Sequence, residues 1–323
     1  MTEKKDELKV AVIDVGSNST KMLVATFDSG GTLTPVTEQS FPCRLLTAES
    51  QKLRLILPGQ IEQISDILRR LISISLKHES EHLILLATEA IRRAGNRVQV
   101  AKLIEKEFGH KLYILSGQQE AELIAEGVYS DPLIRTESHL RIFDLGGGSL
   151  EIIESINGRT TFAKSLPLGA LALAESINFQ PVNAVSTDVK EALRETIFST
   201  ITETGLSTTG TAKLIGLGGT IYFMRKILAQ RRGQEFDQCV HFSLDEISAL
   251  AEEFCTMSSV ERGSAFPALP PDRADIFPLV CLVIEQLMII SGNDFFHHSF
   301  FNLRYGVASK VGKTKGSNVF PPE

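Results

Sequence analysis

The chain has 323 residues, which suits two domains because single domains cluster near ~100–150 residues. It is 43% hydrophobic and 22% charged, as in soluble globular proteins, and its formal charge of −6 argues against a basic coat for nucleic acid. The amino terminus lacks the apolar core of a signal peptide, and the apolar stretch at 276–290 contains a proline and a glutamate. The four cysteines are scattered, as in a reducing compartment. We therefore expect a cytoplasmic protein without nucleic-acid or membrane partners.

Two strand-and-turn segments of the chain resemble each other. Residues 10–19 read as a buried apolar strand that runs into a tight turn of small polar residues, and residues 140–149 read the same way. The two segments align without gaps, so that Asp14, Gly16 and Ser19 correspond to Asp144, Gly146 and Ser149. Each segment is followed by a second apolar run, a glycine-containing hairpin turn and a third strand candidate.

After each set of three strands, helices and strands alternate. The predicted helices cover 61–78, 98–108, 116–128, 187–202, 218–228, 244–255 and 272–290, and the predicted single strands cover 83–88, 111–115 and 212–217. This order, occurring twice, predicts an α/β fold of duplicated actin-like (ribonuclease H-like, ASKHA) domains with an interdomain cleft. We expect domain I at 8–131, with 304–312 returning to it, domain II at 138–303, and a flexible tail at 313–323.

The two duplicated turns are suited to phosphate. Small residues let backbone N–H groups converge on an anion, and hydroxyl and amide side chains add donors. The candidate phosphate ligands are Ser17, Asn18, Ser19, Gly146, Gly147, Gly148, Ser149 and the later turn Gly218, Gly219 and Thr220. Asp14 and Asp144 end their strands beside these turns, where carboxylates hold Mg²⁺ or Mn²⁺. Taken singly, either turn also reads as an ordinary end of a strand.

Several segments together resemble the exopolyphosphatase/guanosine pentaphosphate phosphatase (Ppx/GppA) family in its short two-domain form. They are IDVGSNSTKMLV, ATEAIRRAGN, ILSGQQEAELIAEGV, FDLGGGSLEIIE, IGLGGTI and, more weakly, NLRYGV. The resemblance implies hydrolysis of the terminal phosphate of inorganic polyphosphate or guanosine pentaphosphate. It also implies that Glu120 is the catalytic base, that Arg92 contacts phosphate, and that Asp144 and Glu151 bind the metal. From the residues alone, Glu120 also fits the first turn of a helix, and Glu151 also fits a solvated strand.

Four positions depart from the family pattern: Gln119 beside the base, Leu150 after the second turn, Ala172 after LPLG, and Tyr305 in NLRYGV. They leave open whether polyphosphate or guanosine pentaphosphate is preferred, and whether activity is reduced. Two other functions therefore stay open, a weakly catalytic or non-catalytic binder of these ligands and an ATP-dependent small-molecule kinase of the same superfold. The oligomeric state is also open, with a homodimer as one option.

Scattered basic residues suggest a local path for a long polyanion, although each one also reads as a solvated charge. The candidates are Lys21, Arg44, Arg54, Arg92, Arg225, Lys226, Arg231, Arg232 and Arg304. A polyanion held by several of them would bind less tightly as salt rises.

Overall fold

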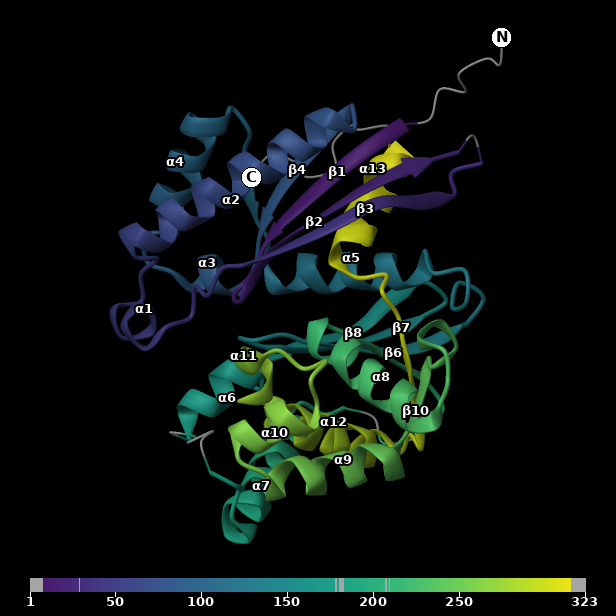
Figure 1. The fold of residues 1–323 in the computed structure, drawn as a ribbon. Helices are drawn as coiled ribbons and strands as arrows, with labels where there is room; N and C mark the ends of the chain where they lie inside the picture. The colour runs from purple at the N-terminus through teal and green to yellow at the C-terminus, as the bar shows by residue number, and fades with distance from the viewer. Residues whose placement is uncertain are drawn as a thin grey trace. The chain divides into compact units, whose positions relative to one another are not determined.

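The computed structural model describes residues 8–314 apart from 29, 178, 180–182, 207 and 209. The chain divides into two compact units. Unit 1 runs up to Thr136 and resumes at Phe301, and unit 2 spans Glu137–Phe300 (Figure 1). No helix in the described part of the chain has the length and apolar character needed to cross a membrane.

Unit 1 is a five-stranded sheet with helices on both faces. In chain order its elements are β1 (Leu8–Val15), β2 (Ser19–Phe27), β3 (Leu33–Pro42), α1 (Ala48–Leu53), α2 (Pro58–Lys77), β4 (His82–Ala87), α3 (Glu89–Arg93), α4 (Arg97–Phe108), β5 (Leu112–Ile114), α5 (Gly117–Tyr129) and α13 (Leu303–Thr314). The strand order is β3-β2-β1-β4-β5, in which β1 is antiparallel to β2 and parallel to β4.

The two faces of this sheet carry different helices. Ile13 of β1 belongs to one core cluster with Ile64 and Leu68, which α2 presents at helical spacing. Val12 points to the opposite face because successive strand residues alternate, and α13 packs against β1 there (Figure 1). Helix α13 also packs against α5. That contact needs glycine, since a Cβ on Gly306 would lie 1.7 Å from the carbonyl oxygen of Leu123.

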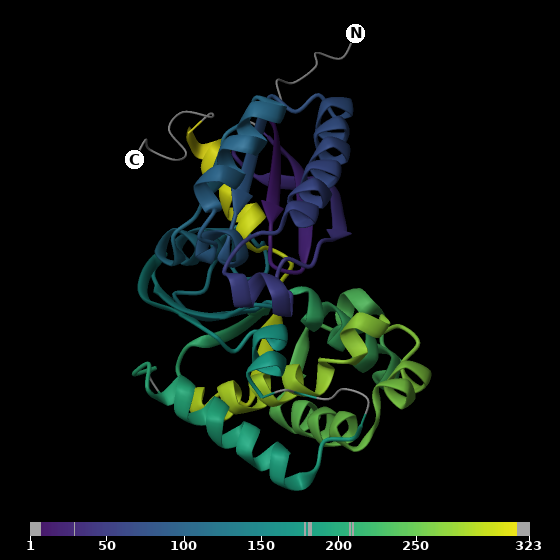
Figure 2. The ribbon, with the colours of Figure 1, turned by 90° about the vertical axis from the view of Figure 1, so that its left-hand side faces the viewer.

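Unit 2 repeats this plan with an added edge strand. Its elements are β6 (His139–Leu145), β7 (Leu150–Ile156), β8 (Arg159–Leu166), α6 (Ala170–Ser176), α7 (Thr187–Thr202), β9 (Lys213–Leu217), α8 (Gly219–Arg232), the 3₁₀ helix η1 (Phe236–Gln238), β10 (His241–Ser243), α9 (Leu244–Thr256), α10 (Ser259–Ala265), α11 (Pro271–Ala274), α12 (Phe277–Ser291) and β11 (Phe295–His298). Helix α12 packs against both α7 and α9 (Figure 2).

The strand orders establish the duplication. Unit 2 has the order β10-β11-β9-β6-β7-β8, so β8-β7-β6-β9-β11 repeats β3-β2-β1-β4-β5. In both units the first three strands form an antiparallel meander. Two later strands extend the sheet in parallel on the free side of the first strand, as β9 and β11 do beside β6. The predicted duplicated α/β fold is therefore confirmed.

Two predicted elements differ from the structure. The helix predicted over 272–290 is two helices, α11 and α12, and Pro278 lies in the first turn of α12, where proline needs no N–H partner. The tail predicted over 313–323 is wrong for Lys313 and Thr314, which complete α13, and the remainder of that tail lies outside the described residues.

Candidate functional site

In the turn between β1 and β2 (residues 16–19, loop 1), two carbonyl oxygens accept hydrogen bonds from the segment that follows β3. The Ser17 oxygen accepts a hydrogen bond from Leu45 N at 2.8 Å, and the Asn18 oxygen accepts one from Cys43 N at 3.0 Å. The N–H of a trans peptide points away from its C=O. The N–H groups of Asn18 and Ser19 therefore face the opposite side of loop 1, where they can donate to an anion.

The turn between β6 and β7 (residues 146–149, loop 2) repeats this arrangement in unit 2. The Gly146 oxygen accepts from Ala170 N at 3.1 Å, and the Gly147 oxygen accepts from Leu171 N at 2.9 Å, both from the first turn of α6. The N–H groups of Gly147 and Gly148 consequently point away from α6. Both loops that the sequence predicts as phosphate ligands are thus oriented to present donors.

A glycine outside the predicted set holds loop 2 against α6. A Cβ on Gly169, the residue before α6, would lie 2.2 Å from Ser149 N and 2.3 Å from the carbonyl carbon of Gly148. Only glycine permits this approach. The sequence analysis used Gly169 only as part of the LPLG segment and assigned it no role, because the contact joins segments that are separate in the chain.

Two candidate metal ligands of unit 2 are direct neighbours across the sheet. Asp144 of β6 pairs with Glu151 of β7 in the antiparallel register, so both side chains lie on one face. Like charges directly opposite each other are unfavourable, whereas a divalent cation would attract both. Glu151 is 6% exposed and accepts a hydrogen bond from Ser165 Oγ at 2.8 Å. Ser165 was not predicted, although it too lies opposite Glu151, on β8.

The equivalent position in unit 1 differs in charge. Asp14 lies opposite Lys21 in the β1–β2 register, where unit 2 has Asp144 opposite Glu151. A lysine beside an aspartate offsets the charge that would attract a cation. Unit 2 is therefore the better place for a divalent metal, and Asp14 is the weaker of the predicted ligands.

The GLGGT turn lies beside the same carboxylates. Gly218 has φ of +119°, which favours glycine, and a Cβ there would lie 3.2 Å from Asp144 Oδ1. Helix α8 begins directly afterwards at Gly219, and the side chain of Thr220 is buried. The structure thus brings Gly218, Gly219 and Thr220 together with Asp144 within unit 2.

No cluster of three or more histidine, cysteine, aspartate or glutamate side chains suited to a metal occurs in the part of the chain that the structure describes. The donors present are the Asp144 and Glu151 carboxylates. This set fits Mg²⁺, which proteins commonly hold through one or two carboxylates while phosphate oxygens and water complete the octahedron.

Unit 1 brings the predicted base and the predicted phosphate-binding arginine into contact. Arg92 Nη1 donates to Glu120 Oε2 at 2.5 Å and to the Leu115 oxygen at 3.0 Å, while Nη2 donates to Glu89 Oε2 at 2.7 Å. Burial disfavours the charged guanidinium, but the attraction of Glu120 and Glu89 outweighs this and raises the pKa of Arg92 above its ordinary value. The neighbouring Arg93 side chain is 69% exposed and binds the other oxygen of Glu89.

Glu89 is the residue of this group that the sequence analysis missed. Glu89 forms ion pairs with Arg92, three residues later, and with Arg93, four residues later. Side chains at these spacings meet on the surface of a helix. That spacing was visible in the sequence. Glu120 is 7% exposed, and the capping role at the start of α5 belongs to Gln119, whose side chain accepts from Ser116 N at 2.9 Å.

Two departures from the family pattern have structural explanations, at Leu150 and Tyr305, and a third contributes a backbone contact. Leu150 is fully buried in the core of unit 2. Tyr305 is 2% exposed in unit 1, where its hydroxyl donates to Glu38 Oε1 at 2.7 Å. Ala172 places its backbone N–H 3.1 Å from the Gly147 oxygen and so helps to hold loop 2.

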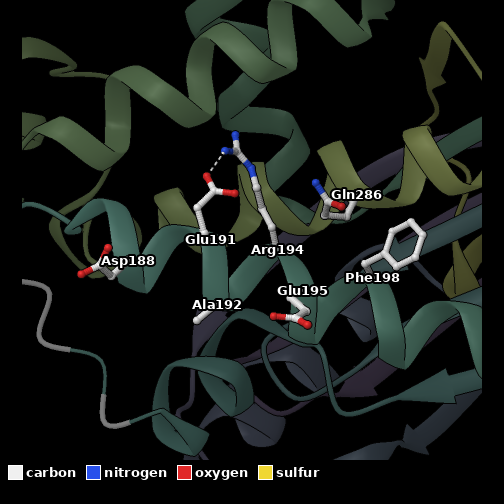
Figure 3. Close-up of a pocket in the computed structure, with 7 residues that line it drawn as sticks. All are labelled: Asp188, Glu191, Ala192, Arg194, Glu195, Phe198 and Gln286. Atoms are coloured by element: carbon white, nitrogen blue, oxygen red, sulfur yellow. Dashed lines mark hydrogen bonds and ion pairs between the residues drawn. The ribbon is translucent and has the colours of Figure 1, made fainter.

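A surface hollow in unit 2 is not the predicted site. It is lined by Asp188, Glu191, Ala192, Arg194, Glu195, Phe198 and Gln286, none of which was predicted (Figure 3). Its single arginine, Arg194, donates to Glu285 and to Glu252 at 2.8 Å each. The other charged side chains of the hollow are carboxylates, which would repel phosphate.

Comparison with known proteins decides the family. The model of the Ppx/GppA phosphatase family matches residues 23–313. The chain belongs to this family. An Aquifex aeolicus member of the Ppx/GppA family superposes with a TM-score of 0.82 at 22% identity, over 96% of this chain and 99% of that one, which supports the actin-like fold alone.

Two curated relatives of this Ppx/GppA protein carry different activities in their names. Exopolyphosphatase 1 of Mycobacterium bovis is 31% identical over 166 residues, or 50% of this chain and 47% of that protein. A guanosine-5'-triphosphate,3'-diphosphate pyrophosphatase of Pseudoalteromonas translucida is 31% identical over 174 residues, or 51% of this chain and 32% of that protein. The matches thus span less than half the length of either relative.

Proposed function

We propose that this protein is a phosphoanhydride hydrolase that releases the terminal phosphate of inorganic polyphosphate or guanosine pentaphosphate. The observation that carries the proposal is the 2.5 Å contact between Arg92 and Glu120, which places a cation for a phosphate beside a carboxylate that can take a proton. Family membership supports a phosphatase, and the two relatives' names support these two substrates.

Both units carry residues suited to this chemistry. In unit 1, Arg92 and the N–H groups of loop 1 would bind phosphate oxygens, and Glu120 would orient the attacking water and accept its proton. In unit 2, the N–H groups of loop 2 and the start of α8 would bind phosphate oxygens. Water adds to the terminal phosphorus, the bridging P–O bond breaks, and the shortened substrate leaves with the bridging oxygen. Such transfer depends mainly on positioning and on neutralising charge.

Mg²⁺ or Mn²⁺ would bind at Asp144 and Glu151, with the hydroxyl of Ser165 fixing the Glu151 carboxylate. Bound there, the metal supplies positive charge against the phosphate oxygens. Asp14, the other predicted ligand, lies opposite Lys21 and would contribute less.

A second candidate is a binder of the same ligands with little turnover. One observation favours it, since the proposed base already binds Arg92 and would have to be released for catalysis. The buried positions of Leu150 and Tyr305 speak against it, because these departures fill the cores of their units.

One experiment separates these functions. Phosphate release is measured with Mg²⁺ from long-chain polyphosphate, guanosine pentaphosphate and ATP in parallel. Hydrolysis of either of the first two supports the proposal, and their relative kcat/KM assigns the substrate. Binding of both without release identifies the binder, while ATP consumption that depends on an added small-molecule acceptor identifies a kinase.

A further inference from the structure

The segment that follows β3 is fixed beside loop 1. Cys43 and Leu45 donate their N–H groups to the loop, and the side chains of two buried polar residues hold the Leu45 oxygen from the other direction. Gln60 Nε2 lies 3.0 Å and Ser50 Oγ 2.6 Å from that oxygen. Gln60 Nε2 also lies 3.2 Å from the oxygen of Arg44. Arg44 therefore stands on a rigid backbone next to loop 1.

The direction of the Arg44 side chain follows from its neighbours. Cys43 and Leu45 are fully buried in the cluster that packs on α2. The side chain between two such residues points away from this cluster, to the opposite face, and Arg44 is indeed exposed. Asp14 also lies on this opposite face, because Ile13 and Val15 on either side of it belong to the α2 cluster. Arg44 thus lies on the same side of the sheet as Asp14.

Arg44 has no ion-pair partner in the part of the chain that the structure describes. Within the described residues, no carboxylate oxygen lies at ion-pair distance from Arg44, whereas Arg92 contacts two carboxylates and Arg304 contacts Glu38. Other members of the predicted basic path are also occupied. Arg231 pairs with Glu253, Arg232 pairs with Glu246, and Arg225 is buried with Nε on the Phe236 oxygen. The predicted path through Arg225, Arg231, Arg232 and Arg304 therefore stays a prediction, which requires a polyanion to compete with these protein contacts.

We propose that Arg44 is a further substrate-binding residue, which contacts the phosphate that follows the one held at loop 1. The inference rests on the proposed function and narrows its substrate to linear phosphoanhydrides of at least two phosphates. A second phosphate gains a charge-assisted hydrogen bond to Arg44, whereas the orthophosphate product, held by loop 1 and Arg92, gains none. Arg44 would thereby make the protein bind phosphate chains more tightly than the released orthophosphate.

The test compares Arg44→Gln with Arg70→Gln, which removes another exposed arginine of unit 1 that has no ion pair in the described structure. Titration calorimetry with tripolyphosphate and with orthophosphate is done in EDTA, so that hydrolysis does not consume the ligand. Losing one charge-assisted hydrogen bond should weaken tripolyphosphate binding about 10–100-fold in Arg44→Gln and leave orthophosphate binding unchanged. Arg44→Lys should recover part of the loss. Arg70→Gln should resemble the wild type for both ligands.

Kinetics with Mg²⁺ give an independent measure. Arg44→Gln should raise KM for tripolyphosphate and leave kcat within about two-fold, because the contact is the same before and during the reaction. Unchanged tripolyphosphate binding and KM, or equal weakening of both ligands, would overturn the assignment of Arg44. A wild type that binds tripolyphosphate through Arg44 but releases no phosphate would instead overturn the proposed hydrolysis and leave this inference standing.

Discussion

Arg92 and Glu120 neutralise each other across 2.5 Å, and both are largely shielded, with side-chain exposures of 20% and 10%. A phosphate that binds Arg92 has to compete with the Glu120 carboxylate for the same guanidinium nitrogen. In the proposed mechanism, success in that competition would release Glu120 to act on water. The pair would then couple the arrival of substrate to the availability of the proposed base.

Replacing Glu120 tests its proposed role as the base. Glu120→Gln keeps the shape of the side chain but cannot take a proton, so kcat should fall by about 10²–10⁴-fold. Tripolyphosphate should bind as well as before, because Arg92 loses a competing carboxylate and keeps Glu89. Single-turnover phosphate release and titration calorimetry measure the two effects. Turnover within a few-fold of wild type would remove Glu120 from catalysis.

Replacing the arginine tests its geometry rather than its charge. The guanidinium of Arg92 serves Leu115, Glu120 and Glu89 together, and an ammonium on a flexible stem cannot hold this fork. Arg92→Lys should therefore lower kcat/KM by at least about 10-fold. Arg93→Lys on the same helix is the control, since that side chain is exposed and binds only Glu89. Equal kcat/KM values in the two variants would show that activity depends on the positive charge of Arg92 and not on the geometry of its guanidinium.

The part of the site that was predictable from the sequence lies in short segments. Loop 1 and loop 2 were found because a strand followed by a turn of small residues is a local pattern and occurs twice. Sequence reading could not supply the facing of Asp144 and Glu151, which depends on strand register, or the contact of Gly169 with loop 2. It took Tyr305 as a departure that leaves the substrate preference open, whereas a tertiary hydrogen bond to Glu38 explains that residue.

Short elements escaped prediction for a related reason. Helix α3 has five residues and β11 has four, too few for either periodicity to be recognised. Strand β11, with the sequence FFHH, also has no alternation of polar and apolar residues. The three-residue spacing of Glu89 and Arg92 was visible in the sequence, but it indicates a contact only once α3 is recognised as a helix.

The cross-strand partners predict different metal dependence for the two aspartates. Asp144→Asn leaves a weaker ligand beside Glu151, so half-maximal activity should require several-fold more Mg²⁺, and excess Mg²⁺ should restore part of the rate. Asp14→Asn should change this requirement less, because its neighbour is Lys21. Mn²⁺ titration calorimetry provides a reading without turnover. The reverse order of effects would place the metal at Asp14.

The thiol of Cys43 predicts a loss of stability in alkali. Burial raises its pKa from 9.0 to about 11, against a smaller lowering effect of the Thr20 side chain. Between these values the unfolded chain releases a proton that the folded protein keeps, so the free energy of unfolding falls as pH rises. The slope from this group approaches about 1.4 kcal/mol per pH unit and is fully absent below the unfolded pKa. Urea unfolding of wild type and Cys43→Ser from pH 8 to pH 10.5 should therefore diverge above pH 9, and parallel curves would contradict the buried, protonated thiol.

Gly169 offers a test of loop 2 that touches no proposed ligand. In Gly169→Ala the new methyl carbon would fall 2.2 Å from Ser149 N, so either α6 or residues 147–149 must move. Because α6 holds loop 2 through the Gly146 and Gly147 oxygens, movement of either turns the loop N–H groups away from a bound phosphate. We expect a loss of about 1–3 kcal/mol in stability from the overpacked contact, and at least a 10-fold loss in kcat/KM.

The control for Gly169→Ala lies in the same unit. A Cβ on Gly263 in α10 meets no atom within 4 Å, and alanine there should stabilise the helix by up to about 1 kcal/mol without changing activity. Unfolding midpoints and phosphate release are measured for both variants. If Gly169→Ala lost stability but kept wild-type kcat/KM at a temperature where it is folded, loop 2 would not be holding substrate, and the phosphate-binding role would fall to loop 1 and Arg92 alone.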